Sequence, residues 1–235
     1  MRTKVAILQS AYIPWKGYFD LIHDVDVFVF YDDVQYTKQD WRNRNRIKTP
    51  DGARWITVPV GDDLRRRICD VVISDSRWQA RHWKTLCQNY ARAPHFARYR
   101  GFLESVYLKS TWQSLSMLNQ CLIQEIAANF LGVRTTFRDS REFRAKGDRV
   151  GRIVDIVRAT GSATYVTGPA ARSYLEEDRF REAGIAIEYK SYTGYPEYSQ
   201  FFPPFDHFIS VLDLLFHVGP DSAQYIWGWR NTAVC

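Results

Sequence analysis

The chain has 235 residues, of which 46% are hydrophobic and 25% are charged. These fractions are ordinary for a folded, water-soluble protein, so they exclude the disordered, collagen-like and coiled-coil classes. The length is enough for one or two domains with a substantial core. Lys and Arg number 32 against 26 Asp and Glu, a formal net charge of +6, which favours an acidic or phosphorylated ligand.

The apolar stretches are too short or too interrupted to serve as membrane or export segments. Residues 5–8 are too few for the core of a signal peptide. The most apolar stretch, residues 208–216, contains Ser210 and Asp213, so no spanning helix is expected. We therefore expect a cytoplasmic protein that does not bind membranes.

The cysteines and histidines lack the spacing of a metal site. Cys69, Cys87, Cys121 and Cys235 include no CxxC pair and no cluster. No pair of histidines has metal-ligand spacing with a carboxylate nearby, so we predict no metal. We interpret the four thiols as buried or idle rather than nucleophilic.

The first third of the chain predicts strands and a hairpin. Residues 4–8 and 25–31 are short β-branched runs, and one or two helical turns fit between them at residues 18–22. Residues 41–48 and 54–59 predict a β-hairpin, because the Pro-Asp-Gly sequence at 50–52 between them favours a turn.

The remainder predicts helices first and then an alternation of helix and strand. Apolar residues recur at helical spacing over residues 76–131, and Gly132 is the expected C-terminal cap. Strands are then predicted at 133–137, 164–167 and 185–189, and helices at 150–159, 170–183 and 210–217. We expect an α/β fold with a mostly parallel sheet, a β-hairpin and an inserted helical segment (76–131), in a single domain over residues 1–235.

The loop after the first strand carries the first set of candidate ligand-binding residues. Ligands of open α/β sheets bind beyond the carboxyl ends of the strands. Gln9, Tyr12, Trp15 and Lys16 suit a sugar or base stacked on an aromatic ring, with its anionic group held by Lys16. The alternative is that the aromatic residues only cover the sheet edge.

Two adjacent carboxylates, Asp32 and Asp33, follow the second strand, with Gln35 and Tyr36 behind them. In an extended chain the two carboxylates point to opposite sides, so at most one of them faces the cleft and is a candidate general base. A solvated turn or a salt bridge is the alternative. We predict that the polar and aromatic residues of both loops line one cleft: Gln9, Tyr12, Trp15, Asp32, Asp33 and Gln35.

A basic segment lies at the start of the predicted hairpin. Alternation along residues 41–48 places Arg42, Arg44, Arg46 and Lys48 on one face of a strand. Guanidinium groups grip phosphate in a bidentate way, so Trp41, Arg42, Asn43 and Arg44 are predicted to contact an anionic part of the substrate. A solvated edge strand is the alternative.

Two further positions bear on function. Gly168 and Pro169 join a predicted strand to a helix start, whose free backbone amides suit an anion, although an ordinary turn explains them equally. No P-loop and no GxGxxG motif occurs in the chain. His207, in a Tyr-, Phe- and Pro-rich segment, is a candidate acid or base near neutral pH.

Several motifs in one order resemble the WbqC-like family over about residues 4–219. They are Gln-x2-Tyr-x-Pro-Trp-x-Gly-Tyr-Phe at 9–19, Asp-Asp-Val-Gln-Tyr at 32–36, Trp-x-Asn-Arg-x-x-Ile at 41–47, Trp-x3-His at 78–82, Tyr-x2-Ala-Pro-x-Phe at 90–96, Gly-Pro-Ala at 168–170 and Asp-Leu-Leu-Phe at 213–216. The chain has Leu8-Gln9-Ser10 where members commonly have His-Gln-Pro. If that histidine is a family catalyst, another residue replaces it here or the reaction differs.

The resemblance implies a role beside surface polysaccharide or other specialised metabolism, where an amino sugar receives an acyl or aminoacyl group. Our leading hypothesis is such a transferase, acting on a nucleotide-activated amino sugar or related metabolite, with Asp32, Asp33 or His207 as base. An activated donor is expected, and no cofactor. The alternatives are an aminoacyl-tRNA-binding module, for which tRNA is the partner, a nucleotide-dependent ligase, and a non-catalytic binding protein.

Overall fold

The structure is a computed structural model that describes residues 3–232. Its centre is a five-stranded sheet in the order β5-β2-β1-β6-β7, in which every neighbouring pair is parallel. The strands are β1 (Lys4–Leu8), β2 (Val27–Phe30), β5 (Thr136–Asp139), β6 (Thr164–Thr167) and β7 (Ala186–Tyr189). A separate antiparallel hairpin consists of β3 (Arg44–Thr49) and β4 (Gly52–Thr57). The fold is therefore the predicted α/β class with a parallel sheet and a hairpin.

Helices surround the sheet and the hairpin. The α-helices are α1 (Lys16–His23), α2 (Trp78–Tyr90), α3 (Phe96–Glu104), α4 (Leu115–Glu125), α5 (Arg149–Ala159), α6 (Glu177–Glu182), α7 (Val211–Val218) and α8 (Trp229–Thr232). Short 3-10 turns are η1 (Ile68–Asp70), η4 (Ser140–Glu142), η5 (Pro169–Ser173) and η6 (Gly219–Tyr225), and π turns η2 (Ser105–Lys109) and η3 (Ile126–Phe130) extend α3 and α4. As predicted, Gly132 follows this helical segment with a positive φ of 67°.

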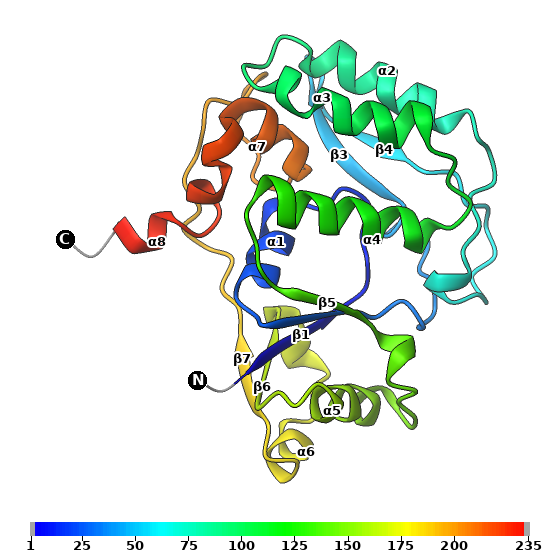
Figure 1. Cartoon of the computed structure of the whole chain (residues 1–235), viewed down its shortest axis with the longest axis vertical. Coiled ribbons are helices and arrows are strands. Elements are labelled where there is room, and N and C mark those ends of the chain that lie inside the picture. The colour runs from blue at the N-terminus through cyan, green and yellow to red at the C-terminus, as the bar shows by residue number, and fades with distance from the viewer. Residues whose placement is uncertain (1–2, 233–235) are drawn as a thin grey trace.

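Both faces of the parallel sheet are covered, which explains why its strands are apolar throughout. In Figure 1, α1 and α4 lie on one side of the sheet, and α5 and α6 lie on the other. Alternate residues of β1 serve the two sides: Ala6 packs in the cluster with α1 and α4, whereas Val5 and Ile7 pack in the cluster with α5 and α6.

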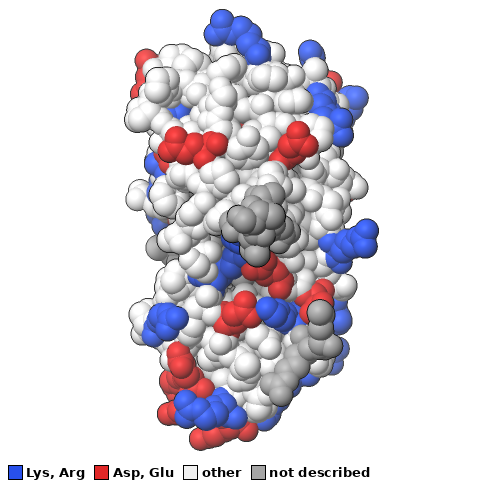
Figure 2. All heavy atoms as spheres, turned by 90° about the vertical axis from the view of Figure 1, so that its left-hand side faces the viewer, with Lys and Arg blue, Asp and Glu red and all other residues white. Residues whose placement is uncertain are grey.

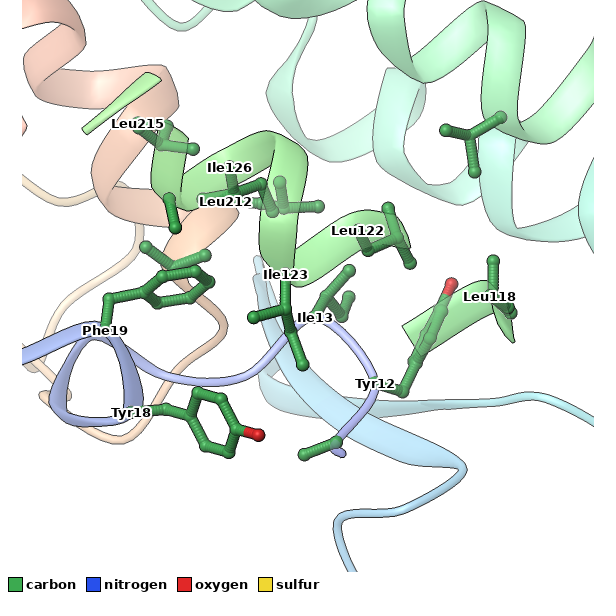
Figure 3. Close-up of a cluster of buried hydrophobic side chains, with 14 of the residues drawn as sticks. Tyr12, Ile13, Tyr18, Phe19, Leu118, Leu122, Ile123, Ile126, Leu212 and Leu215 are labelled. Carbon is green, nitrogen blue, oxygen red and sulfur yellow. The ribbon is translucent and has the colours of Figure 1, made fainter. Parts of the chain in front are cut away.

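The loop after β1 is held in the larger of these two clusters. Figure 3 shows Tyr12 and Ile13 of this loop against Leu118, Leu122 and Ile123 of α4. Both loop residues are fully buried. The loop that we expected to contact ligand is therefore anchored by the core over part of its length.

The strand order creates a topological switch point between β1 and β6. The chain leaves β1 through α1 to reach β2 on one side, and leaves β6 through η5 and α6 to reach β7 on the other. Because the two connections depart to opposite faces, they leave a crevice outside the carboxyl ends of β1 and β6, which is where ligands of such sheets bind.

Several predicted elements were wrong in their extent. The strand predicted at 133–137 is β5, which begins only at Thr136. The helix predicted over residues 170–183 divides into η5 and α6, because the chain leaves helical geometry at Tyr174, whose φ is −138°. The strand predicted to begin at residue 41 begins at Arg44. Before it, the carbonyl of Trp41 accepts a hydrogen bond from the amide of Tyr12, so Trp41 pairs with the loop after β1 instead of the hairpin.

Candidate functional site

A cavity of about 560 Å³ lies at the switch point. The polar and aromatic residues of its wall are Gln9, Tyr31, Gln35, Arg149, Arg152, Tyr165, Thr167 and Tyr174. They come from the ends of β1, β2 and β6, from the first turn of α5 and from the break between η5 and α6. We call it the arginine cavity. Its volume is typical of a site for a small molecule.

Arg149 is the first residue of α5 and lies at the positive end of that helix. The carboxylate of Asp148 caps the helix by accepting a hydrogen bond from the amide of Gly151 at 2.7 Å. The Arg149 guanidinium lies 3.5 Å from the centre of the Tyr174 ring. Among residues 3–232, no carboxylate lies within ion-pairing distance of Arg149. Its N–H groups are therefore available to an anion.

Arg152 lies one helical turn further along α5, and an ion pair with Asp33 fixes its guanidinium. Its Nη2 donates to Asp33 Oδ2 at 2.5 Å, and the hydroxyl of Ser140 donates to Asp33 Oδ1 at 2.5 Å. The Nε atom of Arg152 is buried and has no hydrogen-bond partner within the described part of the chain. Asp33 thus orients a guanidinium that still has an unpaired N–H.

Two tyrosines add hydroxyl groups to this wall. Burial raises the pKa of Tyr31 and of Tyr165 above their ordinary values. Both therefore keep their protons near neutral pH and can donate hydrogen bonds.

A second cavity of about 310 Å³ lies on the other side of the end of β1. We call it the aromatic cavity, because Trp15, Tyr18, Trp41 and Phe208 form much of its wall. Leu8 lines both cavities, so the two adjoin at the last residue of β1.

Arg42 belongs to the aromatic cavity, but its guanidinium is used by the protein itself. Its Nη1 donates to the carbonyls of Gln9 and Ser10 at 2.8 and 2.9 Å, and its Nε lies 3.7 Å from Asp40 Oδ2. Arg42 therefore holds the loop after β1 in place.

The two adjacent carboxylates point to opposite sides, as the strand alternation predicts. Asp33 faces α5, whereas Asp32 is fully buried and accepts from the amide of Ser10 at 2.8 Å and from the Ser116 hydroxyl of α4 at 2.5 Å. Asp32 lines neither cavity, because its oxygens are engaged in joining β1, β2 and α4. Its predicted role as a base is corrected to a structural one.

The six residues predicted to share one cleft are divided by the structure. Gln9 and Gln35 line the arginine cavity, Trp15 lines the aromatic cavity, and Asp33 supports Arg152. Tyr12 is fully buried, with its hydroxyl 2.8 Å from His82 Nδ1 and 2.6 Å from the Tyr107 hydroxyl.

His207 belongs to the segment between β7 and α7, and Lys16 of α1 packs against the same segment. Lys16 is buried, donates to the carbonyl of Pro196 at 3.3 Å and lies 4.9 Å from the centre of the Tyr195 ring. Burial lowers the pKa of Lys16 to about 8. Burial, and then the charge of Lys16, lower the pKa of His207. Lys16 is therefore not placed to hold an anion in either cavity, and the His207 ring is neutral at pH 7.

A third, smaller hollow of about 220 Å³ lies beside the hairpin, and its wall includes Tyr36, Asn43 and Arg44. Arg44 lies 4.2 Å from the Trp55 ring centre and donates to the carbonyl of Gln39. Arg46 pairs with Asp206 at 3.5 Å, and buried Lys48 donates to the carbonyl of Pro204. The predicted continuous basic face is therefore largely engaged in contacts within the protein.

Gly168 and Pro169 lie at the junction of β6 and η5. The η5 turn is only five residues long, so it offers little of a helix dipole. Neither residue lines one of the two cavities at the end of β1.

The sequence analysis missed Arg149, Arg152 and Tyr174. The signal was a pair of arginines three residues apart, of which Arg149 directly precedes the predicted helix over 150–159 and Arg152 lies in its first turn. In an alternating α/β chain, a helix that follows a strand begins at the carboxyl edge of the sheet, so both arginines belong to the ligand-binding side.

The thiols of the described cysteines are free and partly buried. Burial raises the pKa of the free thiols of Cys69, Cys87 and Cys121, and Cys235 lies outside the described residues. Within residues 3–232, no helix combines the length and apolar character needed to cross a membrane.

A parallel sheet with a cavity at its switch point places the protein among the doubly wound α/β folds. The model of the WbqC-like protein family matches residues 9–225, and the chain belongs to this family. It is similar to a protein of Mycobacterium tuberculosis named "Uncharacterized protein Rv1507c", with 43% identity over 225 residues that cover 95% of this chain and 97% of the relative. Leu8 is the wall residue that the two cavities share.

Proposed function

We propose that the protein binds a phosphate-bearing small molecule in the arginine cavity and transfers an acyl or aminoacyl group onto its amine. The acceptor class is a nucleotide-activated amino sugar or a related metabolite. The observation that carries the proposal is the Arg149 guanidinium, which faces a cavity at the switch point without a carboxylate partner among residues 3–232.

The cavity suits phosphate groups for two physical reasons. A guanidinium binds two oxygens of one phosphate in a planar, bidentate arrangement. The unpaired Nε–H of Arg152 gains a partner when an anion binds, which removes the cost of a buried donor without an acceptor. The positive end of α5 adds to the same field.

The proposed reaction needs an amine, an activated carboxyl donor and a proton acceptor. The amine nitrogen attacks the carbonyl carbon of the donor, a C–N bond forms, the bond to the donor's leaving group breaks, and the nitrogen releases one proton. Arg149 and Arg152 hold the phosphates and so fix the position of the amine. The hydroxyls of Tyr31 and Tyr165 are donors for the negative oxygen that develops.

His207 is the proposed proton acceptor. Its ring is neutral at pH 7 because its pKa is lowered, and its Nδ1 has no partner within the described residues. His207 lines neither cavity itself, but it directly precedes Phe208, which lines the aromatic cavity. Asp33 acts as a positioning residue for Arg152.

The surface supports a small molecule over the alternative of tRNA binding. On the face drawn in Figure 2, the described Lys and Arg side chains are interspersed with Asp and Glu side chains. The arginines of the predicted basic strand contact Trp55, Asp206 and backbone carbonyls. A nucleic acid requires a continuous basic path for its phosphates.

Calorimetric titration with inorganic pyrophosphate, uridine diphosphate and a uridine-diphosphate amino sugar tests the site. We expect Arg149→Ala to weaken binding at least about tenfold, equivalent to about 1.4 kcal/mol. Arg172→Ala is the matched control, because Arg172 also stacks on a tyrosine, 3.8 Å from the ring centre of Tyr189, but does not line the cavity. Absence of binding, or an equal loss in both variants, would contradict the proposal.

Mass spectrometry of the acceptor incubated with acyl thioesters and aminoacyl donors tests the reaction. A product heavier by the acyl group, formed without nucleoside triphosphate, supports a transferase. A strict requirement for nucleoside triphosphate, with release of pyrophosphate or phosphate, identifies a ligase. Binding of tRNA that weakens by about 0.7–0.9 log units per log salt for each phosphate contacted identifies the nucleic-acid-binding alternative.

A further inference from the structure

The polar side chains in the wall of the aromatic cavity are occupied by the protein's own backbone. The Tyr18 hydroxyl donates to the carbonyl of Gln9 at 3.0 Å, and Arg42 donates to the carbonyls of Gln9 and Ser10. Asn45 Nδ2 donates to the carbonyls of Tyr12 and Ile13, and its Oδ1 accepts from the amide of Arg46. Apart from the indole N–H groups of Trp15 and Trp41, an occupant therefore finds mainly carbon surfaces.

The mouth of this cavity exposes large aromatic side chains. Trp41 is 40% exposed and Phe208 is 57% exposed, and both line the cavity. Trp15 lies inside, with its ring centre 5.3 Å from that of Phe208. Aromatic rings left open to water at the mouth of a cavity gain free energy when an apolar group covers them.

The aromatic cavity also adjoins the arginine cavity. Leu8 lines both, and its side chain is apolar. In a two-substrate transfer, the molecules in the two cavities would therefore have to meet at the end of β1, beside Leu8.

We propose that the aromatic cavity is the binding site for the acyl group of the donor, and that it selects an uncharged, carbon-rich chain or ring. The assignment of this group to a donor rests on the proposed function, whereas the selection of an apolar occupant follows from the wall alone. A free α-ammonium group is disfavoured there, because the wall contains the positive charge of Arg42 and offers no carboxylate. Of the two transfers considered above, acyl transfer is thus favoured over aminoacyl transfer.

The experiment uses neutral primary amides of increasing chain length, because these carry the carbonyl and chain of an acyl donor without its leaving group. Binding to the full chain is measured by quenching of tryptophan fluorescence. From butanamide to hexanamide to octanamide, affinity should rise about fourfold for each methylene buried. 6-Aminohexanamide, which has an ammonium at the end of the chain, should bind at least about tenfold more weakly than hexanamide.

Three variants locate the binding. Phe208→Ala removes a half-exposed side chain from the mouth and should weaken hexanamide about fivefold or more without affecting the fold. Ala11→Leu fills the cavity from its wall and should abolish binding, with circular dichroism to show that the variant is folded. Trp55→Ala is the matched control: Trp55 is 41% exposed and contacts Trp41, but does not line the cavity, so affinity should change less than about twofold.

The outcomes separate this proposal from the proposed function. Equal affinity along the amide series, or an effect of Trp55→Ala as large as that of Phe208→Ala, would overturn the apolar acyl site. If the amides bind as expected but no phosphate-bearing acceptor binds, the proposed function fails and the apolar cavity stands. If the acceptor binds through Arg149 but the amides do not bind, the apolar acyl site fails and the proposed function stands.

Discussion

The two cavities at the end of β1 both have arginine in their walls, and they use it differently. In the aromatic cavity, Arg42 donates to two backbone carbonyls and approaches Asp40. In the arginine cavity, Arg149 lies on the ring of Tyr174 and has no carboxylate partner among residues 3–232. The Arg42 guanidinium builds the wall of its cavity, and the Arg149 guanidinium is the one that we propose binds a ligand.

The comparison shows that a positive charge beside a cavity does not by itself define an anion site. The free energy available to a ligand depends on how many N–H groups remain unpaired after folding. By this measure we expect the arginine cavity to bind phosphate more tightly than the aromatic cavity does. Substitutions at the two arginines and at their neighbours test this difference.

The largest expected effect is on stability. Arg42→Ala leaves the carbonyl of Ser10 without its donor and removes one of the two donors to the carbonyl of Gln9, which keeps the Tyr18 hydroxyl. It should lower the free energy of unfolding by about 3 kcal/mol. Arg149→Ala loses only a ring contact and should cost about 0.5–1 kcal/mol. Urea unfolding followed by circular dichroism measures both. Equal losses of unfolding free energy in the two variants would contradict the view that Arg42 is a structural residue and Arg149 is not.

The buried side chain of His82, which contacts the loop after β1, should make the stability of the protein sensitive to acid. His82 Nδ1 contacts the Tyr12 hydroxyl of this loop, and His82 Nε2 contacts the carbonyl of Thr57. Burial lowers the pKa of His82 to about 4 from 6.5. Between these values the unfolded chain binds a proton that the folded chain does not, so stability is full above about pH 6.5 and is lost as the pH falls to about 4.

The expected loss from this one group is about 2.5 kcal/mol between about pH 7.5 and about pH 4.5. It is measured as the change in the urea midpoint of the wild type relative to His82→Gln, which takes up no proton in this window. Parallel pH profiles for the two proteins would show that His82 does not carry the acid sensitivity.

The fold was largely predictable because local signals agreed with the tertiary structure. The strand at residues 4–8 matches β1, and the strand at 164–167 matches β6. The alternation of Asp32 and Asp33 also followed from strand geometry. The break at Tyr174 was not predicted: this residue separates η5 from α6, and its ring lies against Arg149 of α5.

The site was predictable only in its position at the carboxyl ends of the strands. The roles of Lys16 and Arg42 depend on partners distant in sequence: Lys16 is buried under Tyr195, and Arg42 reaches the carbonyls of Gln9 and Ser10. Charge and periodicity predict which residues carry N–H groups. They do not predict which of those groups donate hydrogen bonds within the folded protein.

The smallest expected effect concerns Gly168, which the sequence offered as part of an anion-binding turn. Its φ of −73° and ψ of 161° suit any residue, and a Cβ added there would meet the Tyr192 hydroxyl at 3.5 Å, an ordinary contact. Gly168→Ala should therefore change the free energy of unfolding by less than about 0.5 kcal/mol. If the phosphates bind at Arg149, pyrophosphate affinity should also stay within about twofold of the wild type. If they bind instead to the amides at the start of η5, the added methyl group lies where the ligand must approach the backbone, and affinity should fall about tenfold while the melting temperature is retained. Calorimetric titration of this variant beside Arg149→Ala therefore decides which end of the crevice holds the anion, because each location predicts a loss in one variant and none in the other.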